Sequence, residues 1–388
     1  MPRSPLFGRR IHIAGSIPAE LSHAPSADVV AARELIAALT TELIARGATV
    51  VVPVDKENLR QADNQPICFD WLIWETIRSN LHRRPSGAPS PLAIAVQHHK
   101  TEEQIPPEFH GLWDALRSSD LVKIENAAHW NMGSKRMEVQ ARWGDILIAL
   151  GGSEGVYFLA NLYLDAGKPV VPLNLPICAA GTGARRLFDY GLSSLNTPRL
   201  FRTGEGPDPH GWINRINFPS RRSVTEKVTE IVALLEALEP PTAFGVRLLN
   251  PEHEDFAAVE DYFATVVKPI VEDELGYKLV VVDGKQPFDA PRIDQEIFAK
   301  LHRSAVIIAD ITASRPNCFL ELGYALGRSL PVMVLARKDT KHPFDIETLA
   351  GHHWTSTGSV DERRRLFREH WAAIRNRPPL VPMEPLIP

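Results

Sequence analysis

The segment from Val306 to Gly327 contains residues whose types and spacing are suited to chemistry on a bound ligand. Four apolar residues precede Asp310 and are typical of a strand buried on both faces. Pro316 and Asn317 then supply a turn and a candidate helix N-cap, before an apolar run that ends near Gly327. Because ligands of open parallel sheets bind outside the carboxyl ends of the strands, we expect Asp310 and the start of the next helix to border one pocket.

Glu321 is the only charged residue between Arg315 and Arg328, and we expect it in the first turn of that helix or just beyond. There the exposed N–H groups and the helix dipole favour an ionised carboxylate. Such a group suits cleavage of a nicotinamide–ribose bond, because nicotinamide leaves as a neutral molecule and only the ribosyl cation needs stabilisation. The alternative is that Glu321 is a solvated helix residue and Asp310 a loop cap. Asp283, at the end of another predicted strand, either lines the same crevice or caps a turn.

The same part of the chain resembles the bacterial TIR-like domains and the nucleoside 2-deoxyribosyltransferases, from about Ala243 to Arg377. The likeness rests on four short motifs: Ile308–Thr312, Pro316-Asn317, Glu321–Ala325 and Pro331–Leu335. In both families the glutamate on this helix is the catalytic carboxylate, so the resemblance gives that role to Glu321. Substrate-binding positions are expected at Asp310, Asn317, Tyr324 and Asp283.

Two glycine sites in the first half of the chain predict a phosphate-binding loop. Gly15 and Ser16 follow the first predicted strand, and Gly151-Gly-Ser-Glu-Gly155 follows the apolar run Asp145–Leu150 and opens a helix. Glycines let a backbone approach a ligand closely, and a helix N-terminus offers N–H donors to a phosphate. Packing alone explains glycine turns of this kind about as well.

Taken together, the segments Ile13–Ser16, Arg142–Gly155 and Ala166–Pro172 resemble the SLOG family of Rossmann-like domains, which bind nucleotides or nucleotide-derived signals. Members that hydrolyse nucleotides carry a glutamate on the helix after the glycine turn. Here that stretch, Val156–Asn161, has no acid, so the resemblance implies a sensing role. The expected ligand contacts are Gly15, Ser16, Gly151, Gly152, Ser153 and Gly155, with Arg142 and Arg136 as candidate phosphate partners.

The predicted elements alternate between strands and helices on both sides of a break at residues 239–243. We therefore expect an α/β fold with two Rossmann-like or flavodoxin-like domains, each a mainly parallel sheet flanked by helices. The first domain is expected over residues 1–238 and the second over 244–377, with a Pro-rich tail at 378–388. Residues 55–91 form an insertion in the first domain, which we interpret as a surface excursion rather than a lid.

Composition limits the possible partners. The 388 residues are 44% hydrophobic and carry a net charge of −4, which does not favour nucleic acid as a partner. Neither a signal peptide nor a membrane span is predicted, so a cytoplasmic location is expected. The three cysteines are far apart, and the His98-His99 and His352-His353 pairs lack further ligands at metal spacing. No metal and no cofactor are expected.

A ligand-sensing domain joined to a TIR-like domain resembles the prokaryotic antiviral effectors that destroy NAD when a nucleotide signal arrives. The leading hypothesis is therefore an NAD glycohydrolase that is gated by a nucleotide-derived ligand and acts as a homo-oligomer. One alternative is a nucleoside or nucleotide N-ribosyl hydrolase, or a deoxyribosyltransferase-like enzyme. A second alternative is a non-catalytic, nucleotide-binding module for signalling or assembly.

Overall fold

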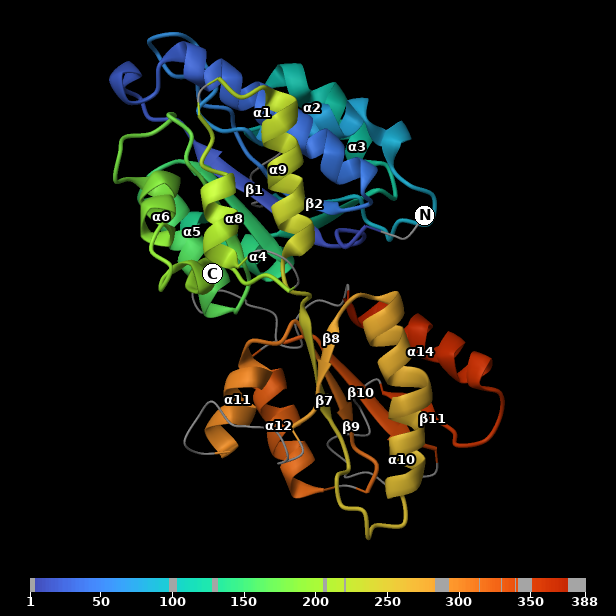
Figure 1. The fold of residues 1–388 in the computed structure, drawn as a ribbon. Coiled ribbons are helices and arrows are strands. Elements are labelled where there is room, and N and C mark those ends of the chain that lie inside the picture. Colours follow the sequence, from blue (N-terminus) through green and yellow to red (C-terminus); the bar gives the residue numbers. More distant parts are fainter. Residues whose placement is uncertain are drawn as a thin grey trace. The chain divides into compact units, whose positions relative to one another are not determined.

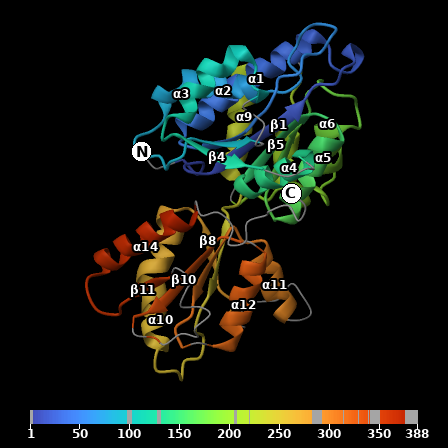
Figure 2. The same ribbon diagram turned by 180° about the vertical axis from the view of Figure 1, so that it is seen from behind.

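The computed structural model describes residues 4–97, 103–127, 132–204, 208–219, 221–282, 293–313, 315–328, 330–338, 340 and 351–375. The chain divides into two compact units, with the boundary between Glu239 and Pro240. Each unit contains one parallel sheet with helices on both faces (Figures 1 and 2). The structure thus confirms the predicted α/β fold with two Rossmann-like units.

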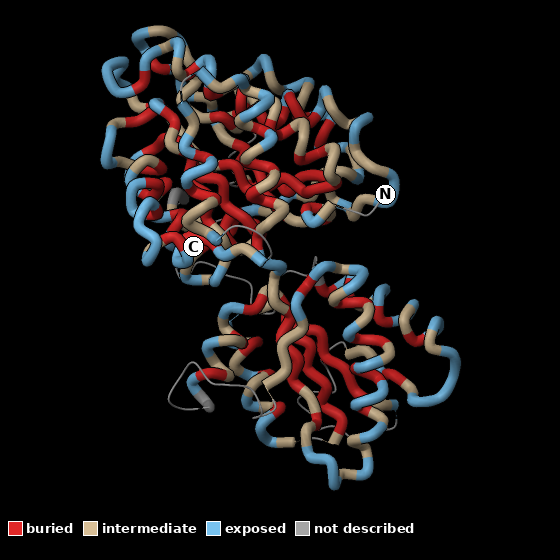
Figure 3. Tube along the Cα trace, in the orientation of Figure 1, coloured by how far each residue is buried: buried red, intermediate tan, exposed pale blue. Residues whose placement is uncertain are grey.

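Unit 1 is built on a six-stranded sheet of order β4-β3-β2-β1-β5-β6, in which every pairing is parallel. The strands are β1 Arg10–Ser16, β2 Thr49–Val54, β3 Ala93–Gln97, β4 Val122–Asn126, β5 Ile146–Gly151 and β6 Val170–Leu173. Every residue of β2, β5 and β6 is buried, because helices cover both faces (Figure 3). The strand order reverses at β1, whose neighbours are β2 and β5, and ligands of doubly wound sheets bind at such a point.

The helices of unit 1 lie in two layers (Figures 1 and 2). One layer contains α1 Ser26–Ala45, α2 Asp70–Ser79, α3 His110–Arg117 and α9 Val224–Ala237; the other contains α4 Met132–Trp143, α5 Glu154–Asp165 and α6 Gly183–Gly191. Two shorter helices, α7 Thr197–Leu200 and α8 Pro209–Arg215, follow α6. Helix α9 begins with a capping box, in which Ser223 and Glu226 bond each other's backbone N–H groups.

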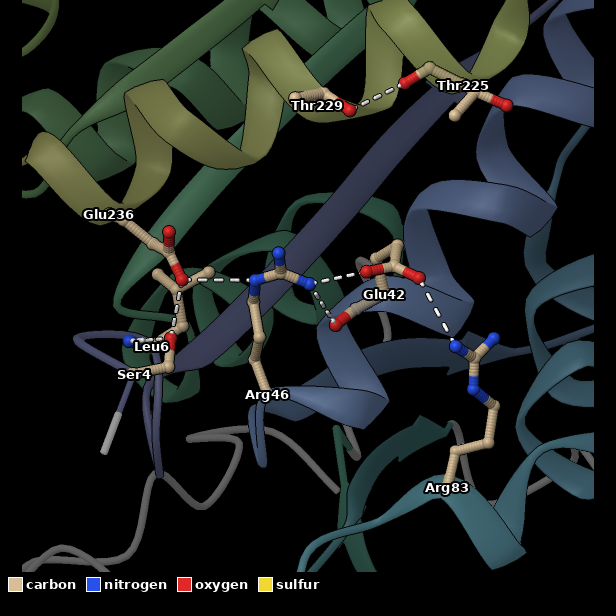
Figure 4. A network of polar contacts seen from close by, with 8 residues as sticks. All are labelled: Ser4, Leu6, Glu42, Arg46, Arg83, Thr225, Thr229 and Glu236. Atoms are coloured by element: carbon tan, nitrogen blue, oxygen red, sulfur yellow. Dashed lines mark hydrogen bonds and ion pairs between the residues drawn. The ribbon is translucent and has the colours of Figure 1, made fainter. Parts of the chain in front are cut away.

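A polar network joins helix α9 to α1, its neighbour in the layer (Figure 4). The Arg46 guanidinium donates to Glu236 of α9 at 3.0 Å and to Glu42 of α1 at 2.6 Å. Ser4 donates to the same Glu236 carboxylate at 2.7 Å, and Arg83 reaches Glu42 at 3.4 Å. The network therefore ties the last helix of the unit to its first residues.

Unit 2 contains a five-stranded parallel sheet of order β11-β10-β9-β7-β8. The strands are β7 Thr242–Val246, β8 Lys278–Val280, β9 Val306–Asp310, β10 Val332–Arg337 and β11 His352–Trp354. In chain order this is the 2-1-3-4-5 arrangement of flavodoxin-like sheets, so the order reverses between β7 and β9. The carboxyl end of β9 is therefore adjacent to the reversal point.

Two separate cores cover the faces of this sheet. On one face lie α10 Phe256–Tyr262, its continuation through residues 263–274, and α14 Val360–Arg375; on the other lie α11 Ile293–His302 and α12 Pro316–Gly327 (Figure 1). The continuation of α10 is π-helical and contains Pro269, which cannot donate the N–H bond that an α-helix requires there. Within the described ranges, no helix is both long and apolar enough to cross a membrane.

Candidate functional site

Asp310 lies at the carboxyl end of β9, as predicted, but its side chain is fully buried. One carboxylate oxygen accepts from the indole N–H of Trp354 at 2.8 Å, and the other accepts from the backbone N–H of Thr312 at 3.0 Å. Burial raises the pKa of Asp310 to about 6, and these two hydrogen bonds oppose the rise. The carboxylate thus links the end of β9 to the edge strand β11, and its oxygens already have partners inside the protein.

Glu321 is the sixth residue of α12, so it lies in the second turn, just beyond the first turn, within the predicted range. The helix begins at Pro316 after Arg315, and the predicted N-cap at Asn317 is wrong. Burial raises the pKa of Glu321 to about 7, although the charge of Arg315 opposes this. The expectation that the exposed N–H groups and the helix dipole favour the ionised form of Glu321 is therefore wrong, because desolvation is the larger effect at this position.

The other predicted substrate-binding residues of unit 2 do not all lie beside Glu321. Tyr324 is one turn beyond Glu321 on α12, and its hydroxyl bonds Nδ1 of His302 on α11 at 3.0 Å. Asn317 is exposed in the first turn of α12. Asp283 lies outside the described residues. Glu321 and Tyr324 thus share one side of the helix, and α11 fixes the orientation of the tyrosine hydroxyl.

In unit 1 the glycine turn follows β5 and lies beside the end of β1. Gly151 and Gly152 have φ values of +54° and +70°, and the Gly152 N–H donates to the carbonyl of Ser16 at 2.6 Å. A Cβ on Gly15 would meet the Leu150 carbonyl oxygen at 1.8 Å, and one on Gly183 would meet that of Gly152 at 2.2 Å. At Gly15 and Gly183 the contacts that demand glycine are therefore made by the chain's own backbone.

The start of α5 fits a phosphate better than the glycines themselves do. Ser153 precedes the helix, is exposed, and makes no capping hydrogen bond with its side chain. Gly155 lies in the first turn, where a Cβ would meet only Met137 Cε, at 3.3 Å. The N–H groups of this turn are oriented as in phosphate-binding helices.

The structure does not bring Arg142 to this turn. Arg142 lies near the end of α4, just before β5 begins, and its carbonyl accepts from Lys168 Nζ at 3.0 Å. Gly151 is at the other end of β5, and a strand of six residues spans about 17 Å. Arg136, nearly two helical turns earlier, points to the correct edge and forms an ion pair with Asp55, directly after β2.

Sequence analysis missed Asp70, because it lies in the insertion that we interpreted as a surface excursion. The first part of the insertion folds back to the sheet: the Ile17 N–H donates to the Ile67 carbonyl at 2.9 Å, and Ser16 pairs with Cys68. Asp70 then opens α2, and its pKa is raised mainly by burial, with a smaller contribution from the charges of Asp55 and Glu57. The sequence does contain one indication of this position: an aspartate, Asp70, stands directly before the amphipathic run that forms α2, as is typical of a helix start.

Residues 6–235 match the family model described as "ATP nucleosidase Cap17-like, N-terminal". The chain belongs to this family. The matched region covers most of unit 1, and the match says nothing of unit 2. The comparison with curated proteins finds no match for this Cap17-like chain.

Two solved structures show a distant likeness to the Cap17-like chain. One is TM1055, a structural-genomics target, which is 16% identical over 47% of this chain and 81% of that one, with a TM-score of 0.29. The other is a conserved protein from Enterococcus faecalis V583, which is 14% identical over 34% of this chain and 98% of that one, with a TM-score of 0.23. Scores this low carry no functional argument.

The Cap17-like chain thus has a carboxylate on the helix after β9 in unit 2 and another near the end of β1 in unit 1. Glu321 and Asp70 both have a pKa raised to about 7, so each exchanges its proton near neutral pH. Within the residues that the structure describes, no group of three or more His, Cys, Asp or Glu side chains could hold a metal ion. The chemistry that these side chains support is acid–base and electrostatic catalysis.

Proposed function

We propose that the protein is a nucleosidase that hydrolyses the nicotinamide–ribose bond of NAD, with Glu321 as the catalytic carboxylate. The observation that carries the proposal is the position of Glu321: half-buried, one turn from Tyr324, on the helix that follows the strand next to the reversal point of the sheet. The family description, which names an ATP nucleosidase, supports cleavage of an N-glycosidic bond. The resemblance of residues 243–377 to TIR-like domains supports NAD as the substrate.

The proposed mechanism uses the ionised form of Glu321. As the nicotinamide–ribose bond breaks, positive charge develops on the ribose, and nicotinamide departs without a proton. Water then adds to C1′ and releases its proton to solvent, which gives nicotinamide and ADP-ribose. A carboxylate in a partly desolvated site stabilises this charge more strongly than one in water. The hydroxyl of Tyr324, held by His302, is placed to position the ribose, while Asp310 keeps β11 joined to β9.

The test measures nicotinamide release from NAD by the full-length protein and by Glu321→Gln. We expect the substitution to reduce the rate by a factor of about 100 or more, because it removes the charge with little change in shape. Glu252→Gln, an exposed position in the same unit, is the matched control and should keep the wild-type rate. NAD that stays intact with the wild type, with or without added nucleotides, would contradict the proposal.

ATP is the second candidate substrate, and the family description is the observation that favours it. A side-by-side assay of ATP, NAD and unphosphorylated nucleosides separates the possibilities, since the released bases differ. Release of adenine from ATP and of no base from NAD would identify an ATP nucleosidase and overturn the assignment to NAD.

We further propose that unit 1 gates NAD cleavage by binding a nucleotide-derived ligand at the start of α5, in a homo-oligomer. A carboxylate at Gly152 would repel phosphate and would also meet Val156, because a Cβ there lies 2.2 Å from Val156 Cγ2. Gly152→Asp should therefore abolish activation by nucleotides and leave the basal rate of NAD cleavage unchanged. Light scattering should give a mass of at least twice the 43.2 kDa of one chain, and a mass of 43.2 kDa would contradict the homo-oligomer.

A further inference from the structure

We propose that two copies of this chain join through the outer edges of their β4 strands, which pair antiparallel about a two-fold axis at Ile124. This edge would form the homo-oligomer proposed above, on which the inference rests. Three features of unit 1 point to this pairing: an uncovered edge at β4, the direction of its backbone groups, and the charges that self-pairing brings together.

The two edges of the sheet in unit 1 differ in how far they are covered. At one edge, all four residues of β6 are buried. At the other edge, labelled β4 in Figure 2, no residue is buried, and Ile124 is 36% exposed. Among the described residues, β3 is the only strand that pairs with β4. An uncovered edge presents backbone N–H and C=O groups to which a strand of another chain can pair.

The hydrogen bonds to β3 determine which backbone groups of β4 point outward. Of the two residues that flank β4, Leu121 accepts an N–H of β3 at 3.1 Å, and Ala127 donates to a carbonyl of β3 at 2.7 Å. Because the backbone groups of successive residues point to opposite sides of a strand, the odd-numbered residues bond β3. The even-numbered residues, with Ile124 at their centre, therefore direct their N–H and C=O groups away from the sheet.

Antiparallel pairing at Ile124 uses these outward groups. Ile124 and its copy exchange two backbone hydrogen bonds, and each Asn126 N–H donates to the Val122 carbonyl of the second copy. The Val122 N–H already donates to the Ser119 carbonyl of its own chain, at 3.3 Å. The two Ile124 side chains, which are exposed in one chain, then lie against each other on one face of the joined sheet.

The charges of β4 favour this arrangement over a parallel one. Lys123 and Glu125 are on the other face, on either side of Ile124, and form an ion pair at 2.9 Å. With the axis at Ile124, Lys123 of each copy lies opposite Glu125 of the second copy, in the pairs whose side chains are closest. Parallel pairing in register would place each of these charges opposite its own kind, which is destabilising. A strand that carries one lysine and one glutamate at these positions is therefore complementary to itself.

The helices next to β4 take part in the same contact. Helix α3 packs against β4, and α4 packs against β3 on the other face, so both helices approach their copies when the strands pair. Stable interfaces bury about 1,200–2,000 Å², and a strand of five residues buries less than this. The two helices would have to supply the remainder.

The experiment measures the mass of the full-length protein by light scattering, for the wild type, Lys123→Glu, Glu125→Lys, and an equimolar mixture of these two variants. Each variant alone places like charges opposite each other, so its mass should fall by a factor of two from that of the wild type. In the mixture, a strand with two acidic residues meets one with two basic residues, and the wild-type mass should return. Lys56→Glu makes the same change at an exposed lysine of unit 1 outside β4; this matched control should keep the wild-type mass.

Recovery in the mixture excludes misfolding as the cause of the lower mass, because each chain is the same as when it is alone. Single variants that keep the wild-type mass, or a mixture that stays at the lower mass, would overturn pairing through β4 and leave the homo-oligomer standing. A wild-type mass of 43.2 kDa would overturn both. Nicotinamide release by the same preparations tests NAD cleavage separately, since neither position belongs to unit 2.

Discussion

Glu321 has a pKa that burial raises to about 7, and the proposed chemistry uses its ionised form. Stabilisation of a ribosyl cation needs ionised Glu321, so nicotinamide release should rise with pH. With a pKa of about 7, the ionised fraction increases about tenfold between pH 6 and pH 8. A rate profile of NAD cleavage over this range tests the prediction, and a flat profile would contradict it.

At Asp310 the expected effect of substitution is on stability. Asp310→Ala leaves the Trp354 and Thr312 N–H groups without acceptors in a buried place, which costs about 1–3 kcal/mol each. We expect the free energy of unfolding of unit 2, measured with urea, to fall accordingly. Asp310→Asn keeps one acceptor oxygen and should lose less.

The pH dependence of stability at Asp310 has a definite sign. Its folded pKa of about 6 lies above the usual value of 3.8, so the folded state holds the proton more tightly than the unfolded state. The contribution of Asp310 to stability is therefore greatest below pH 4 and is lost as the pH rises to 6. Urea titrations of wild type and Asp310→Asn between pH 4 and pH 7 should converge or cross in this window; a constant difference would contradict the assignment.

Among the elements, helix α6 depends on a glycine at its start. Gly183 has a φ of +48°, and a Cβ there would lie within 2.3 Å of the Gly151 and Gly152 carbonyl oxygens. Gly183→Ala should therefore lower the free energy of unfolding by more than 2 kcal/mol. Gly181→Ala is the control: its φ of +73° is equally unusual, but no atom lies within 4 Å, and about 1 kcal/mol is expected. Equal losses in urea unfolding would show that contact with the turn is unimportant.

The strands and the main helices could be predicted from the sequence because their apolar runs are buried on both sides. The run before Asp310 is an example, since all five residues of β9 are buried. The insertion could not be predicted in this way. Its anchor is a charged residue, Arg60, which is 1% exposed and is held by Asp63 and by the Ala24 carbonyl at 2.7 Å. A polar segment fixed by hydrogen bonds has no hydrophobic period that would reveal its path.

For the site, the sequence was sufficient to place Glu321 on the helix after β9, but its protonation depends on how closely other elements surround it. The same limit applies to the arginines of α4. Arg136 and Arg142 are both on this helix, and only the direction of the helix relative to β5 shows which one reaches the carboxyl edge. The direction in which a helix runs across a sheet is set only when the fold is assembled, so it could not be predicted from the sequence.

For the molecule as a whole, the proposed roles of the two units predict that their effects can be separated. Gly152→Asp in unit 1 should abolish activation by nucleotides and keep the basal rate of nicotinamide release, whereas Glu321→Gln in unit 2 should lose both. If Gly152→Asp is activated by nucleotides as strongly as the wild type, the proposed gate is contradicted.

The segment of residues 55–70, which folds back to the sheet before α2, has a consequence for how the end of β1 can vary. It brings an acidic side chain, Asp70, to this end of the sheet without using a residue of the sheet. The segment is fastened by hydrogen bonds from Ile17 to the Ile67 carbonyl and from Arg60 to the Ala24 carbonyl. A different side chain at position 70 would therefore change the surroundings of the end of β1 while the strands and the glycine turn keep their sequence.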